Sequence, residues 1–312
     1  MDQTVAFVFP GQGSQAIGML AGLAALHPMI RDTFAEASEG AGVDLWALSQ
    51  EDPEQQLNQT EFTQPALLAA GVAVWRLWQQ QGGAQPTVLA GHSLGEYAAL
   101  VAAGTLSLVD GARLVRLRGQ LMQDAAPAGS GAMAAVLWAD DALVVDVCAE
   151  ASGDEVVVPA NFNSPGQIVI GGDVAAVDRA LAMLAEHGVR KTVRLAVSVP
   201  SHTPLMRGAA ERLSTAMAGL DWHEPQISVV QNVDALVHDG ALAIRDALVR
   251  QLYLPVQWTG CVKALAARGV TRVAECGPGK VLTGLIKRTD KSLDARELGT
   301  PEEFDAVLED WR

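Results

Sequence analysis

A serine in the pattern G-x-S-x-G stands between an apolar run and a helix-like run. Gly91-His92-Ser93-Leu94-Gly95 follows Thr87–Ala90 and precedes Glu96–Ala103. In the order strand, sharp turn and helix, this pattern is typical of a nucleophile elbow, whose glycines let the backbone hold the serine exposed. The N-terminus of the following helix would stabilise negative charge that develops at the site. A glycine-rich turn with an incidental serine is the alternative, and the flanking strand and helix favour a nucleophile.

A serine nucleophile needs a base to take its proton, and His202 is the best placed of the six histidines. It follows Val197–Ser201, where the chain returns from a smaller inserted domain to a larger one, and it precedes a helix opened by Pro204. A residue at such a junction can face a cleft between two domains. The usual third member is a carboxylate that holds the imidazole. No spacing selects one among Asp221, Asp234, Asp239 and Asp246.

Arg118 falls within an apolar stripe. In the helical run 108–125, apolar residues lie three and four positions before and after it. A cation buried there without a partner is costly, and guanidinium prefers a bidentate carboxylate. The partner is either a buried Asp or Glu of the protein or the carboxylate of a substrate. In the second case the site selects acyl groups that end in a carboxylate, because only these neutralise Arg118.

Two further glycine-rich turns follow apolar runs. Gly11–Ala16 fits G-x-G-x-x-A formally. A dinucleotide site also requires a second strand ending in an acidic residue, and 28–40 is helical in pattern instead. We therefore expect this turn to line the active site, with Gln12 offering an amide. Gly277–Lys280 lacks the first glycine and the Ser or Thr of a phosphate loop, so we interpret it as a structural turn.

Strand and helix patterns alternate along most of the chain, which predicts a mostly parallel sheet covered on both faces. The expected class is α/β with an α/β-hydrolase-like core of residues 1–127 and 199–312. Between 128 and 198 the order becomes βαββαβ, which is typical of a ferredoxin-like subdomain inserted into that core. A helix is expected from Gln64 to Gln81, with Pro65 in its first turn. Strands of the inserted part are expected at Ala132–Trp138, Glu155–Ala160, Gln167–Ile170 and Arg190–Val197.

The composition excludes several classes of protein. Of the 312 residues 49% are apolar, which is enough for a sizeable core and argues against disorder. A net charge of −14 argues against non-specific binding to nucleic acid or to anionic membranes. Three scattered cysteines without a C-x-x-C indicate neither a zinc site nor a disulfide framework. We find no signal peptide and no apolar run of membrane-spanning length, so we expect a cytoplasmic protein.

Five segments together resemble one known family. Phe9–Gln15, Gly91–Glu96, Asn161–Gln167, Val199–His202 and Gly277–Lys280 occur in the order found in bacterial malonyl-CoA:acyl carrier protein transacylases. These are the stand-alone enzymes of dissociated fatty-acid synthesis. The resemblance covers about residues 4–290, and the joint presence of the motifs is far more specific than any one of them.

The resemblance implies a role for each candidate residue. Ser93 would carry the malonyl ester and His202 would be its base. Arg118 would bind the malonyl carboxylate, in agreement with its place in the apolar stripe. Gln12 and the backbone N–H of Leu94 would form the oxyanion hole.

Gln251 would orient His202 through its backbone carbonyl, which would explain why no acid stands out.

The implied mechanism is ping-pong transfer of malonyl from malonyl-CoA to the phosphopantetheine thiol of acyl carrier protein. No metal or bound cofactor is required, and a monomer is expected. Acyl carrier proteins are acidic, as is this chain, so docking needs local basic residues. The hypothetical contacts are Arg190, Lys191, Lys287 and Arg288.

Three alternatives to malonyl transfer for fatty-acid synthesis are left open. A serine hydrolase forms the same acyl-enzyme but resolves it with water. The same transfer chemistry also serves polyketide synthesis and malonate decarboxylases. A scaffold that binds carrier protein without turnover would use the surface alone.

Overall fold

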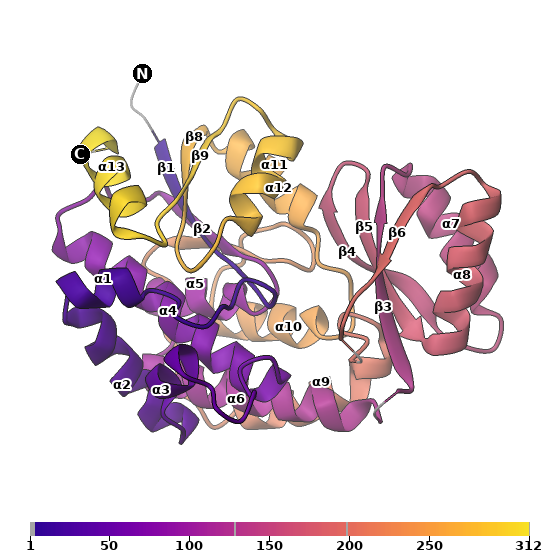
Figure 1. Cartoon of the computed structure of the whole chain (residues 1–312), viewed down its shortest axis with the longest axis horizontal. Helices are drawn as coiled ribbons and strands as arrows, with labels where there is room; N and C mark the ends of the chain where they lie inside the picture. The colour runs from indigo at the N-terminus through magenta and orange to yellow at the C-terminus, as the bar shows by residue number, and fades with distance from the viewer. Residues whose placement is uncertain (1–3, 128, 198, 312) are drawn as a thin grey trace.

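The larger part of the molecule is organised around a parallel β-sheet (Figure 1). The computed structural model describes residues 4–127, 129–197 and 199–311, and within them five strands follow the order β7-β2-β1-β8-β9. Neighbouring strands run parallel, so their carboxyl ends meet at one edge of the sheet. The mixed α/β class predicted from the sequence is confirmed. The strands are β1 (Thr4–Phe9), β2 (Val88–Gly91), β7 (Ser228–Val230), β8 (Val270–Glu275) and β9 (Asp294–Glu297).

The central strand β1 is buried on both faces, as a parallel sheet between two layers of helices requires. Phe7 and Phe9 enter a large apolar core on one face, whereas Ala6 and Val8 enter a second core on the other. This alternation follows from the two-residue period of a strand. Helices α11 (Trp258–Ala267) and α12 (Val281–Thr289) contribute to the second core. Those of the first core are α1 (Ala21–Leu26), α2 (Met29–Ala41), α3 (Leu45–Gln50), α4 (Thr60–Gln80), α5 (Gly95–Ala102), α6 (Leu108–Ala125), α9 (Arg207–Met217), α10 (Ala241–Gln251) and α13 (Pro301–Trp311), and a 3₁₀ turn spans Pro204–Met206.

A separate antiparallel sheet lies beside this core (Figure 1). In the described part of the segment, the sheet order is β4-β5-β3-β6 and the chain order is the expected βαββαβ. Two helices cover one face, and the other face carries Met133, Ala160 and Val169. The predicted boundary residues 128 and 198 lie outside the described residues. The elements are β3 (Gly131–Leu137), α7 (Asp141–Ser152), β4 (Val157–Ser164), β5 (Gln167–Asp173), α8 (Val174–Glu186) and β6 (Lys191–Arg194).

Strand β4 joins the small sheet to the core. The N–H of Phe162 donates to the carbonyl of Val256 at 2.9 Å, and the N–H of Val256 donates to that of Ala160 at 2.9 Å. The strand continues four residues beyond the Ala160 end expected from the sequence. This extension places Asn161 and Asn163 at the boundary between the two parts.

Helix α4 begins four residues earlier than the sequence predicts. Pro65 is its sixth residue rather than a member of its first turn, so the helix lacks the hydrogen bond that its N–H would donate. Burial of Thr60, Phe62 and Gln64 accompanies this additional turn. Tertiary packing therefore overrides the proline signal, and it brings the side chains of Thr60 and Gln64 towards the site.

Within the described ranges, no helix is long and apolar enough to cross a membrane. The same residues contain no group of three or more His, Cys, Asp or Glu side chains arranged to hold a metal ion. Cys148, Cys261 and Cys276 are buried free thiols.

Candidate active site

The G-x-S-x-G segment forms a strained turn between β2 and α5. Ser93 has a φ of +52°, which a non-glycine residue rarely adopts. The flanking glycines are required by close approach of the backbone. A Cβ on Gly91 would lie 1.9 Å from the carbonyl carbon of Gly95, and one on Gly95 would lie 1.9 Å from the oxygen of Phe9. The geometry is that of a nucleophile elbow.

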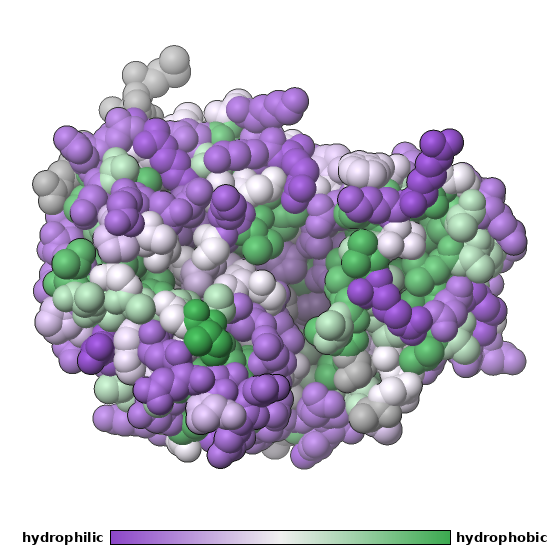
Figure 2. Space-filling view, in the orientation of Figure 1, coloured by the Kyte–Doolittle hydropathy of each residue, from purple (hydrophilic) through white to green (hydrophobic). Residues whose placement is uncertain are grey.

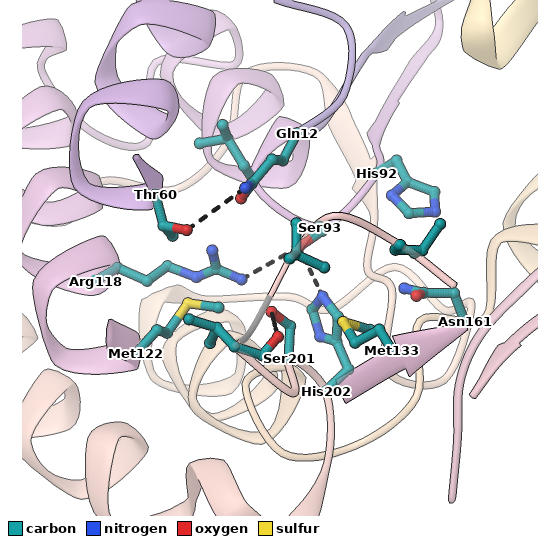
Figure 3. A pocket seen from close by; sticks show the side chains of 14 residues that line it. Gln12, Thr60, His92, Ser93, Arg118, Met122, Met133, Asn161, Ser201 and His202 are labelled. Atoms are coloured by element: carbon teal, nitrogen blue, oxygen red, sulfur yellow. Dashed lines mark hydrogen bonds between the residues drawn. The ribbon is translucent and has the colours of Figure 1, made fainter. Parts of the chain in front are cut away.

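Ser93 and His202 are in direct contact (Figure 3). Ser93 Oγ lies 2.7 Å from His202 Nε2, and His202 Nδ1 lies 2.6 Å from the backbone oxygen of Gln251. Because a carbonyl only accepts, Nδ1 carries the proton and Nε2 is free to accept one from Ser93. Burial first, and then the positive charge of Arg118, lower the pKa of His202 to about 3. The imidazole is therefore neutral at physiological pH.

Among the described residues, no carboxylate oxygen lies within 4.0 Å of the nitrogens of the His202 ring. None of the four aspartates that the sequence leaves open is within this distance, and three of them pair with other groups. Asp234 pairs with His238 and Arg250, Asp246 with Arg250, and Asp221 with His223. The backbone carbonyl of Gln251 occupies the position that a carboxylate has in a Ser-His-Asp triad.

Arg118 of α6 is buried beside the Ser93–His202 pair. Its side chain is 1% exposed, and its Nη2 lies 3.3 Å from Ser93 Oγ. Nη1 donates to Gln64 Oε1 at 2.8 Å, and Nη2 donates to Gln251 Oε1 at 3.0 Å. Among residues 4–127, 129–197 and 199–311, no carboxylate oxygen comes within 4.0 Å of the guanidinium, so an internal acid partner is not found. The site can therefore receive an anion next to the serine.

A cavity of about 140 Å³ opens between the core and the small sheet, where Figure 2 shows the surface hollowed. Ser93, Arg118 and His202 line this cavity (Figure 3). Much of the remaining wall is apolar, which favours a small acyl group held by few polar contacts. The apolar wall includes Met122, Met133, Leu195, Val197 and Val199.

Gln12 and Leu94 line the same cavity. Gln12 Nε2 donates to Thr60 Oγ1 at 3.4 Å (Figure 3). In the described part of the chain, no protein group accepts from the backbone N–H of either Gln12 or Leu94. Leu94 also caps the N-terminus of α5. Two free N–H groups beside a serine hydroxyl could serve as an oxyanion hole if that serine attacks an acyl group.

Several functional contacts could not be found from the sequence. Asn232, at the carboxyl end of β7, accepts from the N–H of Ser93 at 2.7 Å and donates to the oxygen of Gly91 at 2.6 Å. His92 lies away from the base, and its Nε2 contacts Asn163 Oδ1 at 2.7 Å. The available signal for Asn232 is a pair of polar residues directly after a buried strand, at the edge where sites of α/β sheets form.

The four basic residues expected to contact a carrier protein are exposed and do not line the cavity. Lys191 Nζ lies 4.8 Å from the ring centre of Trp138, on the small sheet. Lys287 and Arg288 lie in the last turn of α12. The two pairs thus stand on different parts of the molecule.

Comparison with known proteins identifies the family. Residues 6–303 match the acyl transferase domain. A malonyl CoA-acyl carrier protein transacylase of Salmonella typhimurium is 54% identical over 303 residues, which are 97% of this chain and 98% of that protein. The malonyl-CoA:acyl carrier protein transacylase of Xanthomonas oryzae pv. oryzae has 76% identity and a TM-score of 0.98 over 100% of this chain and 99% of that one.

A further solved structure is a type II polyketide acyl carrier protein in complex with its malonyl-transacylase. It is 50% identical, with a TM-score of 0.97 over 99% of this chain and 100% of that chain. Matches of this extent, together with the geometry of Ser93, Arg118 and His202, lead to one conclusion. The chain is an acyltransferase and belongs to the family of malonyl-CoA:acyl carrier protein transacylases.

Proposed function

We propose that this protein transfers malonyl from malonyl-CoA to the phosphopantetheine thiol of acyl carrier protein through an ester on Ser93. One observation carries the proposal. Ser93 Oγ lies 2.7 Å from a neutral imidazole and 3.3 Å from a guanidinium that has no carboxylate among the described residues. A base and an anion site therefore meet at one nucleophile, as attack on an acyl group with a terminal carboxylate requires.

The first half-reaction forms the ester. His202 Nε2 takes the proton of Ser93 Oγ as the oxygen attacks the thioester carbonyl. The resulting oxyanion accepts from the N–H groups of Gln12 and Leu94. The C–S bond breaks, and His202 returns its proton to the sulfur of coenzyme A. The carrier thiol then follows the same steps in reverse, giving a ping-pong cycle.

Gln251 and Arg118 have distinct tasks in this cycle. The backbone carbonyl of Gln251 keeps Nδ1 of His202 protonated, so that Nε2 is always the basic nitrogen. The guanidinium of Arg118 binds the malonyl carboxylate bidentately and excludes acyl groups without a charge.

Acyl carrier protein is the proposed partner. The named relatives act with such proteins, and one solved neighbour is a complex with one. Because the chain carries a net charge of −14, an acidic partner must meet local positive charge. Arg190 with Lys191, and Lys287 with Arg288, are the proposed contacts.

Other expectations from the sequence remain proposals. We propose that the reaction needs no metal or bound cofactor, that the protein acts as a cytoplasmic monomer, and that it supplies fatty-acid synthesis. We also propose that residues 1–127 and 199–312 form one α/β-hydrolase-like core and that residues 128–198 form a separate subdomain.

The covalent intermediate is tested by mass spectrometry of acid-quenched protein after incubation with malonyl-CoA alone. We expect one malonyl group per chain, mapped to Ser93 and absent from Ser93→Ala. Coenzyme A release should stop after one equivalent because no thiol is present to take the group. Rapid, continuous release would instead identify a hydrolase, and a wild-type protein without an adduct would refute the proposed transfer.

Replacing Arg118 with Ala should slow acylation by malonyl-CoA by about 100-fold, since truncating one member of a buried charge pair costs about 2–5 kcal/mol. Acylation by acetyl-CoA should fall less, so the preference for malonyl should decrease. Arg113→Ala, on the exposed face of the same helix, is the control and should behave as wild type. A normal malonyl preference in Arg118→Ala would show that another group binds the carboxylate.

The low pKa of His202 predicts the acid side of the pH profile. Its neutral form, which is the base, persists above the folded-state value of about 3 and is lost below it. The kcat/KM of Ser93 acylation reports the free enzyme, so it should show no fall near 6.5, the ordinary value for histidine. Stopped-flow measurement of Ser93 acylation between pH 3 and pH 6.5 checks this prediction. A decrease of kcat/KM as the pH falls through about 6.5 would contradict it.

Charge reversal tests the carrier contacts. We expect Lys287→Glu with Arg288→Glu, and Arg190→Glu with Lys191→Glu, to raise the KM for carrier protein by about tenfold or more. Acylation by malonyl-CoA should stay unchanged. Arg31→Glu with Arg113→Glu, exposed cations on α2 and α6, controls for net charge. If one of these double variants has an unchanged KM for carrier protein, its two residues do not belong to the docking surface.

A further inference from the structure

Glu96 is a buried carboxyl directly behind the nucleophile elbow. It is the second residue of α5, its side chain is 0% exposed, and it does not touch the cavity. Among the described residues no Lys, Arg or His nitrogen lies within 4.0 Å of it, so it is not one half of an ion pair. A carboxyl in the first turn of a helix is favourable, but this does not explain why it is fully buried.

One oxygen of Glu96 accepts from two amides, one in the backbone and one in a side chain. Its Oε2 accepts from the backbone N–H of Asn232 at 2.7 Å and from Gln251 Nε2 at 3.0 Å. Its Oε1 has no hydrogen-bond partner in the part of the chain that the structure describes. Both hydrogen bonds of this carboxyl therefore go to Asn232 and Gln251, which contact the residues of the active site.

The acceptor on Glu96 determines which way the Gln251 amide faces. With Nε2 towards Glu96, the other end of the amide, Oε1, accepts from Arg118 Nη2 at 3.0 Å. Reversing the amide would place two donors, Nε2 and Nη2, against each other and would leave Glu96 facing an oxygen. The same Nε2 donates to the backbone oxygen of Ser93 at 3.0 Å. Glu96 therefore fixes a group that contacts both Arg118 and the nucleophile.

Asn232 links the same oxygen to the strained turn. While its backbone N–H donates to Glu96, its side chain bonds the N–H of Ser93 and the carbonyl of Gly91. These bonds stabilise the residue at φ +52° from both sides. A shift of Asn232 would release the elbow.

We propose that Glu96 is a positioning residue for malonyl transfer, whose Oε2 orients Gln251 and Asn232 and so couples the placement of Arg118 to that of Ser93. This inference rests on the proposed function of the same site. This positioning role depends on where the accepting oxygen of Glu96 lies and not on the charge of the carboxyl.

The chemistry of the site supports the geometric role. Burial raises the pKa of Glu96 to about 8, so the neutral carboxyl predominates at pH 7. A glutamine reproduces that form, because its carbonyl can replace Oε2 while its NH₂ takes the side of the unpartnered Oε1. Aspartate keeps the acid but withdraws it by one methylene from both amides.

Three variants separate geometry from charge. We expect Glu96→Gln to keep the rate of Ser93 acylation within a few-fold of wild type, with the same malonyl-to-acetyl preference. Glu96→Asp and Glu96→Ala should slow malonyl acylation by about 100-fold, as misplacement of reacting groups by about 1 Å does. Their malonyl preference should fall by about tenfold, equivalent to losing one hydrogen bond to a charged group. Each variant is first shown to be folded by circular dichroism and its Tm.

Glu275 provides a matched control. It is also 0% exposed and accepts two backbone N–H bonds, from Leu282 at 3.0 Å and Thr283 at 2.7 Å, but it contacts none of the site residues. Glu275→Gln and Glu275→Asp should lower the Tm without changing the malonyl preference. If Glu96→Ala does not fold, the Gln and Asp variants carry the test.

The outcomes distinguish this inference from the function on which it rests. Absence of a malonyl adduct in wild type would refute the function. A normal wild type with an impaired Glu96→Gln and a normal Glu96→Asp would show that charge matters, and would overturn the positioning role. Unchanged rates and preference in Glu96→Asp would also overturn it.

Discussion

The burial of a cation without a carboxylate is the constraint on which the rest of the site depends. Arg118 is 1% exposed, and its acceptors are the neutral amide oxygens of Gln64 and Gln251 together with Ser93 Oγ. Neutral amides satisfy N–H donors but supply no negative charge, so the cost of burying the guanidinium is only partly offset. We propose that a ligand carboxylate completes the balance. The helices α4, α6 and α10 each supply one side chain to this arrangement, so the guanidinium is held in position without a ligand.

The same constraint explains the form of the Ser–His pair. A carboxylate beside His202 would also attract Arg118 and would compete with a substrate for it. The backbone carbonyl of Gln251 fixes the tautomer of the imidazole without adding a charge. Burial and the nearby guanidinium then keep the imidazole neutral. The site thus keeps its positive charge free of an internal carboxylate, because amide groups rather than acids contact Arg118 and His202.

The sequence predicts what depends on local pattern. The elbow is visible because strand, glycines and helix are contiguous, and the burial of Arg118 follows from the helical period around it. The contacts of Asn232 and Glu96 join residues 136 to 155 positions apart, and amide side chains carry no local signature of their partners. The proline signal predicts a helix that begins at Gln64, yet α4 begins at Thr60 because packing outweighs that signal. The cavity depends on how β3, β4 and the segment after β6 lie against the core, which no single segment encodes.

A crystal structure of the protein trapped as its malonyl-Ser93 ester would show which group binds the malonyl carboxylate. We expect this carboxylate to lie against both terminal nitrogens of Arg118, with the ester oxygen directed at the N–H groups of Gln12 and Leu94. A carboxylate that points into solvent, with Arg118 still bonded only to Gln64 and Gln251, would contradict it.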